Sequence, residues 1–207
     1  MAAAPLLVLD HVRKVYTRGH LVRRPTFTLE ADLVIEQSGI IGVVGPNGAG
    51  KTTLFEMMTG SNAPSAGHVY VAGTDIHRVK YRERDRLAIH YHQSYQVRAF
   101  DRGTPDFLLE RAGSDRPRVH LFDEPQFNTQ DGYIGFMLDF FHTLRSRNCL
   151  VFLCLHPNEP YHIDILRQCC ERFIFVQRGQ LTHAADLDAL GRDPHVRAYL
   201  GALASVL

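Results

Sequence analysis

The sequence contains no tryptophan, only four cysteines, and almost no excess of either charge. The cysteines at positions 149, 154, 169 and 170 form no C-x-x-C pair, and Cys154 lies in a very apolar run. We therefore expect buried thiols in a reducing compartment, not disulfides or a zinc site. Lys and Arg number 23 and Asp and Glu number 22, for a formal net charge of +1. That balance argues against a nucleic-acid binder that works through bulk positive charge.

Long apolar runs are also missing. No apolar stretch approaches the ~18 residues that a bilayer-spanning helix needs. The first residues carry no basic segment ahead of their short apolar stretch, so they predict a first strand and not a secretory leader. The 12 histidines have no ligand spacing. His90 and His92 alternate and would share one face of a strand, but a metal site there would need further ligands, and we expect none. We expect one well-packed cytoplasmic domain over residues 1–207.

The first forty residues have the pattern of antiparallel strands. Residues 6–16 and 26–36 are rich in Val, Leu, Ile and Thr, and the second segment partly alternates between apolar and polar residues. Such segments suit strands with one face in water. Gly19, Arg23, Arg24 and Pro25 are expected in the connection between them.

From residue 39 onward the pattern changes to buried strands alternating with helices. Continuous apolar runs occupy residues 40–44, 119–122, 150–155 and 173–177, as expected of strands covered on both faces. Helical patterns occupy 52–59, 132–147 and 159–171, and the chain ends with a hairpin turning at 178–179 and two amphipathic helices. These features predict an α/β fold with a mostly parallel sheet and an N-terminal antiparallel β subdomain.

The segment "GPNGAGKTT", residues 45–53, fits the phosphate-binding pattern G-x-x-x-x-G-K-[ST] (the P-loop or Walker A motif) between a buried strand and a helix. Its glycines allow a tight turn that brings backbone N–H groups close to phosphate oxygens. The Lys51 ammonium would reach the β- and γ-phosphates, and the Thr52 hydroxyl can bind Mg²⁺. The predicted nucleotide-binding residues are Gly45, Pro46, Asn47, Gly48, Ala49, Gly50, Lys51, Thr52 and Thr53.

Two adjacent acids, Asp123 and Glu124, end the apolar strand "VHLF" and precede a proline. Asp123, at the Walker B position, can hold Mg²⁺ beside Thr52, directly or through water. Glu124 could orient or deprotonate the water that attacks the γ-phosphate. The alternative interpretation of Glu124 is a solvated loop acid.

Taken together, "GPNGAGKTTLFEMMTG", "VHLFDEP" and "LVFLCLHP" resemble the nucleotide-binding subunits of ATP-binding cassette (ABC) transporters, in that family's order. The resemblance extends over nearly the whole chain and implies ATP and Mg²⁺ as ligands. It places Tyr16 where an aromatic ring stacks on adenine, although an ordinary strand tyrosine is the alternative. Gln93, with Gln96 as the fallback, falls at the glutamine that contacts Mg²⁺ and the attacking water. His156 matches the histidine that contacts the γ-phosphate, so the implied catalytic set is Lys51, Gln93, Glu124 and His156.

Two departures from the family pattern stand out. Only 30 positions separate Gln93 from Asp123, and no LSGGQ-type signature occurs anywhere in the chain. We therefore infer that the family's helical subdomain, together with its signature motif, is deleted from this chain. Where the family has an aspartate after DEP, this chain has Gln130, with Asp131 one position late, which weakens the expectation of its contacts across a dimer interface.

The deletion shapes the expected function. The signature of one family subunit completes the ATP site of the other, so we expect an ATPase (an ATP hydrolase) that is weak or inactive alone. Its expected partners are a signature-bearing ABC ATPase subunit, a membrane subunit or both, in a hetero-oligomer at the inner face of the membrane. The alternative is a nucleotide-sensing regulatory or assembly subunit with little turnover. A metabolic enzyme would need an acceptor site that is not recognisable here, and a DNA-repair ATPase would need a coiled-coil insertion.

Overall fold

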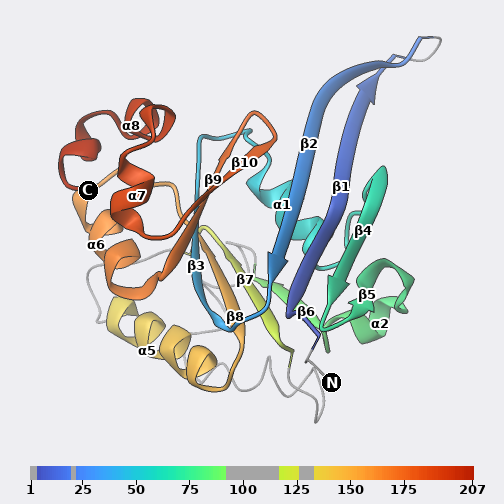
Figure 1. The fold of residues 1–207 in the computed structure, drawn as a ribbon, viewed down its shortest axis with the longest axis horizontal. Coiled ribbons are helices and arrows are strands. Elements are labelled where there is room, and N and C mark those ends of the chain that lie inside the picture. The colour runs from blue at the N-terminus through green and yellow to red at the C-terminus, as the bar shows by residue number, and fades with distance from the viewer. Residues whose placement is uncertain (1–3, 20–21, 92–116, 126–132) are drawn as a thin grey trace.

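The computed structural model describes residues 4–19, 22–91, 117–125 and 133–207. Two sheets form its framework (Figure 1). The four-stranded sheet has the order β2-β1-β4-β5 and is antiparallel, and the six-stranded sheet has the order β10-β9-β3-β8-β7-β6. Strand β10 is antiparallel to its neighbour, and the remaining strands of that sheet run parallel. The predicted α/β class, with its N-terminal antiparallel sheet, is confirmed.

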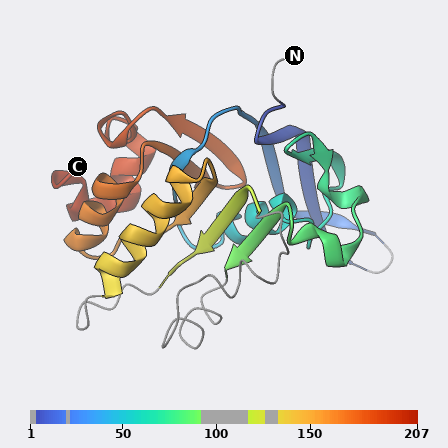
Figure 2. The ribbon, with the colours of Figure 1, turned by 90° about the horizontal axis from the view of Figure 1, so that it is seen from below.

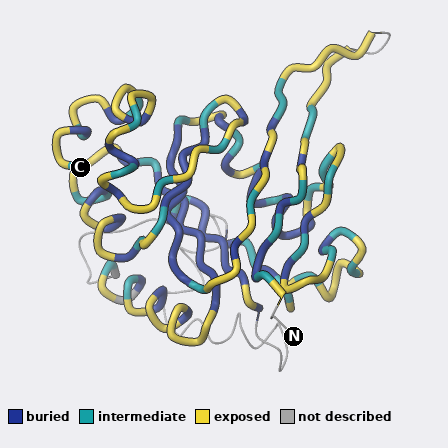
Figure 3. Tube along the Cα trace, viewed as in Figure 1, coloured by how far each residue is buried: buried dark blue, intermediate teal, exposed yellow. Residues whose placement is uncertain are grey.

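The antiparallel sheet is built on a long hairpin of β1 (Leu7–Arg18) and β2 (Arg24–Ile35), whose exposed end extends away from the rest of the chain (Figures 1 and 3). Arg24 and Pro25 belong to β2 and not, as predicted, to the connection, because the pairing continues after an irregularity beyond Tyr16. β2 lies at the edge of its sheet, where a proline is tolerated. Strands β4 (Ala66–Val71) and β5 (Thr74–Asp75) complete this sheet.

The six-stranded sheet contains the apolar runs found in the sequence. Every residue of β3 (Gly39–Val44), β7 (Val119–Asp123) and β8 (Leu150–Cys154) is buried, which Figure 3 shows as the dark centre of the molecule. Strands covered on both faces need such continuous apolar sequence, and this explains why they could be predicted. The other members are β6 (Ala88–Tyr91), β9 (Arg172–Gln177) and β10 (Gln180–Ala184).

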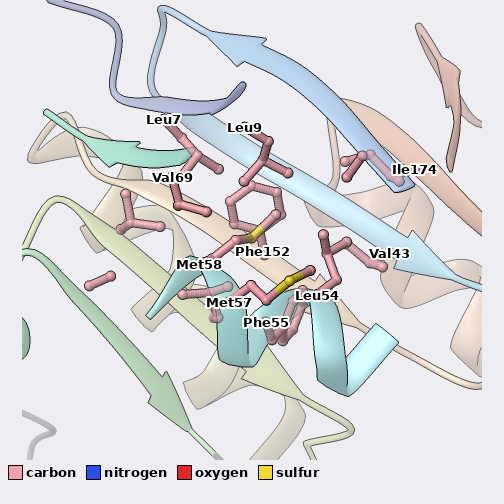
Figure 4. Packing of buried hydrophobic residues seen from close by; sticks show 14 of the residues in the cluster. Leu7, Leu9, Val43, Leu54, Phe55, Met57, Met58, Val69, Phe152 and Ile174 are labelled. Carbon is pink, nitrogen blue, oxygen red and sulfur yellow. The ribbon is translucent and has the colours of Figure 1, made fainter. Parts of the chain in front are cut away.

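Helices cover both faces of this sheet and create two hydrophobic cores. Helix α1 (Lys51–Met58) lies between the two sheets, where Leu54 and Phe55 pack with Leu9 and Phe152 (Figure 4). On the opposite face lie α5 (Tyr133–Ser146), α6 (Pro160–Cys169), α7 (Leu187–Gly191) and α8 (Pro194–Leu200), seen from below in Figure 2. Short elements complete the described chain: η1 (Ile76–Arg78), α2 (Tyr81–Arg84) and η2 (Gly201–Ser205).

The predicted turn at Arg178 and Gly179 joins β9 to β10 and connects both sheets to the phosphate-binding loop. The Gly179 amide donates to the Ala49 carbonyl at 3.0 Å, and the Glu30 amide donates to the Gly179 carbonyl at 2.8 Å. Gly179 has a φ of 76°, and a Cβ there would lie 1.9 Å from the Thr28 carbonyl oxygen. Only glycine fits this close approach, so the turn buttresses the loop from behind.

The described residues add two further observations. None of their helices is long and apolar enough to cross a bilayer. The thiols of Cys149, Cys154 and Cys169 are buried, and Cys170 is partly buried. The predicted burial of these thiols is therefore confirmed for three of them.

Candidate nucleotide-binding site

The loop 45–50 connects the end of β3 to the start of α1 at the carboxyl edge of the parallel strands, where open α/β sheets bind their ligands. Gly45, Gly48 and Gly50 have φ values of 154°, 74° and 109°, so the chain turns through conformations that favour glycine. The first N–H groups of α1 have no partner within the helix and point towards this loop. The backbone therefore has the shape of an anion cradle.

The Lys51 ammonium lies at the centre of the loop. Its Nζ donates to the carbonyl oxygens of Gly45 and Pro46, at 2.7 and 3.1 Å. The residue is only 6% exposed. A buried ammonium is stable here because the loop carbonyls solvate it. The contact of Lys51 with the β- and γ-phosphates stays a prediction.

The remaining loop residues line the cradle to different depths. Ala49 is buried, Asn47, Gly48 and Thr52 are exposed, and Thr53 is partly buried. A Cβ on Gly50 would lie 2.9 Å from the Phe27 ring, so β2 approaches the loop from the side of the antiparallel sheet.

Asp123 meets the first turn of α1. The Thr52 hydroxyl donates to Oδ2 of Asp123 at 2.9 Å, and Nε2 of His90 lies 3.4 Å from the same oxygen. Burial acts to raise the pKa of the Asp123 carboxyl, but hydrogen bonds from His90 and Thr52 outweigh it and lower that pKa. The carboxylate is therefore ionised at neutral pH, and with the hydroxyl it forms a pair of hard oxygen donors that fits Mg²⁺.

Glu124 follows with a left-handed backbone. Its φ is 51°, and its amide donates to the Cys154 carbonyl at 3.0 Å. Non-glycine residues adopt this conformation rarely, and when they do so the surroundings hold them there, often at functional sites. The partly buried Glu124 is therefore held at the strand end, which argues against the alternative of a freely solvated loop acid.

His156 lies in the middle of the same edge. β8 runs between β3 and β7, and the Leu155 amide extends the pairing by donating to the Val43 carbonyl at 3.1 Å. The next residue, His156, therefore emerges between the loop strand and the strand that ends in Asp123. Its Nδ1 is 2.8 Å from the hydroxyl of Tyr199, which comes from α8.

The Tyr199 hydroxyl is held in its protonated form. Burial raises its pKa well above the usual value, and Cys154 and Glu124 add to the effect. The backbone of Gly45 acts in the opposite direction, which indicates that the hydroxyl lies close to the first residue of the loop. Tyr199 thus extends the site to the C-terminal helices.

Tyr16 lies on β1, in the antiparallel sheet. It pairs with Phe27, the residue that approaches Gly50, and its ring centroid is 6.2 Å from that of Phe27. The Tyr16 hydroxyl accepts a hydrogen bond from Asn62 at 2.8 Å. The side chain is 37% exposed, so a flat ring is available near the loop.

Four residues singled out in the sequence, Gln93, Gln96, Gln130 and Asp131, lie outside the described residues. Their roles remain predictions.

Sequence reasoning missed two members of the site. His90 shares a face of the sheet with Asp123, because His90 pairs with Leu121 in the β6–β7 register. The alternation of His90 and His92 in the sequence was the only signal for His90. It points to Asp123 only once β6 is known to lie beside β7. Tyr199 has no sequence signal, since it reaches His156 across 43 positions of chain.

Comparison with known proteins places this geometry in a family context. Residues 29–104 match the family model described as ABC transporter. Similar curated proteins include the methionine import ATP-binding protein MetN of Nocardia farcinica, 43% identical over 37% of this chain and 22% of that protein. The lipopolysaccharide export system ATP-binding protein LptB of Acidithiobacillus ferridurans is 36% identical over 42% of this chain and 33% of that protein. The matched segment therefore spans a third or less of these relatives.

Solved structures extend the likeness of the fold. The ATP-binding cassette MJ0796, a dimer in a post-hydrolysis state bound to ADP and Pi, aligns with a TM-score of 0.64 at 15% identity, over 86% of this chain and 98% of that one. A bacterial Atm1-family ABC exporter with ATP bound aligns with a TM-score of 0.69 at 16% identity, over 99% of this chain and 43% of that one. Residues 29–104 are thus similar to the ABC transporter family, and the chain has the fold of these ATP-binding cassettes.

Proposed function

We propose that this chain is an ATP-binding, Mg²⁺-dependent ATP-hydrolysing subunit of an ABC-transporter-like complex. Three chemical groups that meet at one edge of the sheet carry the proposal. They are an ammonium inside the glycine-rich loop, a hydroxyl in the first turn of α1 and an ionised carboxylate at the end of β7. Lys51, Thr52 and Asp123 supply them. This combination matches the chemistry of a magnesium-bound triphosphate.

Each residue has a defined task in this proposal. The Lys51 ammonium and the loop amides neutralise the β- and γ-phosphates. The Thr52 hydroxyl and the Asp123 carboxylate, 2.9 Å apart, would hold Mg²⁺, which when bound offsets the negative charge of the phosphates. The exposed Tyr16 ring would stack on adenine.

The groups that act on the reaction itself lie at the ends of β7 and β8. Glu124 orients or deprotonates the attacking water, and His156 donates to the γ-phosphate. Gln93 would complete this set by contacting the water and Mg²⁺. The held backbone of Glu124 supports its assignment, because general bases act only from a fixed position.

The proposal includes a partner. The sequence contains no LSGGQ-type segment, so the face of the site opposite the P-loop has to come from another chain. We place residues 1–207 in one domain that works as part of a hetero-oligomer, with a signature-bearing ABC ATPase subunit, a membrane subunit or both. The complex would lie at the cytoplasmic face of a membrane. Alone, the chain would hydrolyse ATP weakly.

The same missing signature favours a second candidate function. A chain that retains the cradle and loses the opposing half could bind ATP as a sensor, in a regulatory or assembly subunit, with almost no turnover. The two functions differ in what a signature-bearing partner does to hydrolysis.

Lys51→Ala tests the cradle. Binding of Mg²⁺–ATP to the full chain, measured by calorimetry, should weaken at least about tenfold, because one hydrogen-bonded charge pair to phosphate is lost. Lys80→Ala, which removes an exposed lysine at the start of α2, is the matched control and should bind normally. Unchanged affinity in Lys51→Ala would overturn the assignment.

Glu124→Gln separates the two functions. In a single-turnover assay with a signature-bearing cassette subunit, the wild-type chain should hydrolyse ATP, and Glu124→Gln should bind ATP while losing hydrolysis. If the wild-type chain binds ATP but never turns it over with any such partner, the sensor function replaces the ATPase function.

A further inference from the structure

The C-terminal helices contribute a side chain to the proposed nucleotide site at the carboxyl edge of the parallel strands. Helix α8 is anchored by Val196 and Leu200, which are buried in the core against the six-stranded sheet. Its start is capped by Asp193, whose carboxylate accepts the His195 amide at 2.7 Å. The same helix carries Tyr199, so a fixed element holds this side chain in place.

The contacts of Tyr199 constrain it from two sides. Its ring lies against Phe175 of β9, with centroids 5.9 Å apart, and against His156, with centroids 5.7 Å apart. Its hydroxyl lies 2.8 Å from Nδ1 of His156. Within the described part of the chain, this is the only hydrogen bond of the His156 ring, which leaves Nε2 available for a ligand.

The direction of this hydrogen bond decides what His156 can do. A neutral imidazole carries one N–H and one lone pair, so the nitrogen that accepts a bond determines which nitrogen keeps the proton. When the tyrosine hydroxyl donates to Nδ1, the proton stays on Nε2. A nitrogen that faces phosphate oxygens must carry a proton, because two acceptors do not bond.

We propose that Tyr199 is a positioning residue that donates to Nδ1 of His156 and thereby holds the tautomer whose Nε2–H faces the terminal phosphate. This inference rests on the proposed ATP-binding function. Tyr199 touches no reacting atom and acts only through His156. Its consequence is selectivity: the hydrogen bond it supports exists with ATP and is missing with ADP, which lacks the γ-phosphate.

Nucleotide affinity tests this positioning role. The dissociation constants of Mg²⁺–ATP and Mg²⁺–ADP would be measured for the full wild-type chain, Tyr199→Phe, His156→Ala and the double variant. In Tyr199→Phe the ATP affinity should fall about fivefold while the ADP affinity stays the same. This is the size of effect expected when one hydrogen bond to a charged group, here from His156 to the γ-phosphate, is weakened. The double variant should bind like His156→Ala, since both changes remove the same interaction.

The matched control is Tyr91→Phe, which breaks another tyrosine–histidine hydrogen bond, to His120, and should leave both affinities unchanged. The inference would be overturned if Tyr199→Phe left the ratio of the ATP and ADP affinities unchanged. Additive losses of ATP affinity in the double variant would overturn it as well. If Lys51→Ala weakens ATP binding and Tyr199→Phe leaves the ratio unchanged, only the positioning role fails. If Lys51→Ala also binds normally, the proposed function fails with it.

A spectroscopic readout examines the tautomer without nucleotide. Long-range proton–nitrogen NMR spectra of the ¹⁵N-histidine-labelled chain at pH 8 should show the His156 proton on Nε2, with the signal identified by its loss in His156→Ala. The share of this tautomer should decrease in Tyr199→Phe. A proton on Nδ1 in the wild-type chain would overturn the inference.

Discussion

Two tyrosine–histidine hydrogen bonds of the same chemistry occur in different surroundings. The Tyr91 hydroxyl lies 3.0 Å from Nδ1 of His120 in the core, and the Tyr199 hydroxyl lies 2.8 Å from Nδ1 of His156 at the carboxyl edge of the parallel strands. The His120 ring is fully buried, and its Nε2 bonds to the Pro117 carbonyl at 3.0 Å. The His156 ring is partly exposed.

The difference lies in the second nitrogen. Both nitrogens of His120 bond to protein groups, and Tyr91 stacks on Phe122 with ring centroids 4.3 Å apart, so the His120 ring keeps no nitrogen for a ligand. His156 makes one hydrogen bond among the described residues, through Nδ1, and in our proposal its Nε2 faces the terminal phosphate. A hydrogen bond is structural when it completes a buried network and functional when it orients a group that still has a bond to make.

Removing each histidine gives the largest expected contrast. His120→Ala leaves a cavity and two buried groups without partners, so it should lower the free energy of unfolding by about 3 kcal/mol or more. His156→Ala should cost less than about 1 kcal/mol, because water replaces the partly exposed ring. Urea unfolding monitored by circular dichroism measures both. His142→Ala, on the exposed face of α5, is the control with no effect. Equal losses at 120 and 156 would remove the distinction between the pairs.

The pH dependence of stability should report on the buried Tyr91–His120 pair. Burial lowers the pKa of His120 to about 4, below the usual 6.5 of an unfolded chain. The unfolded state therefore binds more protons, and stability is lost as the pH falls from 6.5 towards 4, by about 3 kcal/mol at about 1.4 kcal/mol per pKa unit. The free energy of unfolding, measured across this range, should change less steeply in His120→Gln. A variant that keeps the wild-type slope would show that His120 is not the group that titrates.

The same contrast explains what could be predicted from the sequence. The P-loop was recognisable because its pattern is local: residues 45–53 contain both the glycines and the lysine of the proposed phosphate site. The buried strands were recognisable because strands such as β8 need unbroken apolar sequence. The contacts of His90 with Asp123 and of Tyr199 with His156 depend on sheet order and helix packing, which no local pattern encodes. Pro25 was misplaced because its tolerance in β2 depends on the strand being an edge.

Removing each hydroxyl gives the smallest and sharpest contrast. Tyr91→Phe leaves Nδ1 of the buried His120 without its partner, so it should lower the free energy of unfolding by about 1 kcal/mol. Tyr199→Phe should cost about half as much, because water can reach the partly exposed His156. The order is reversed for the preference for ATP over ADP, which only Tyr199→Phe should reduce. Urea unfolding and calorimetry on the same two proteins measure both effects. If Tyr199→Phe is the more destabilising change and leaves the nucleotide preference intact, its hydrogen bond serves to dock α8 and both pairs are structural.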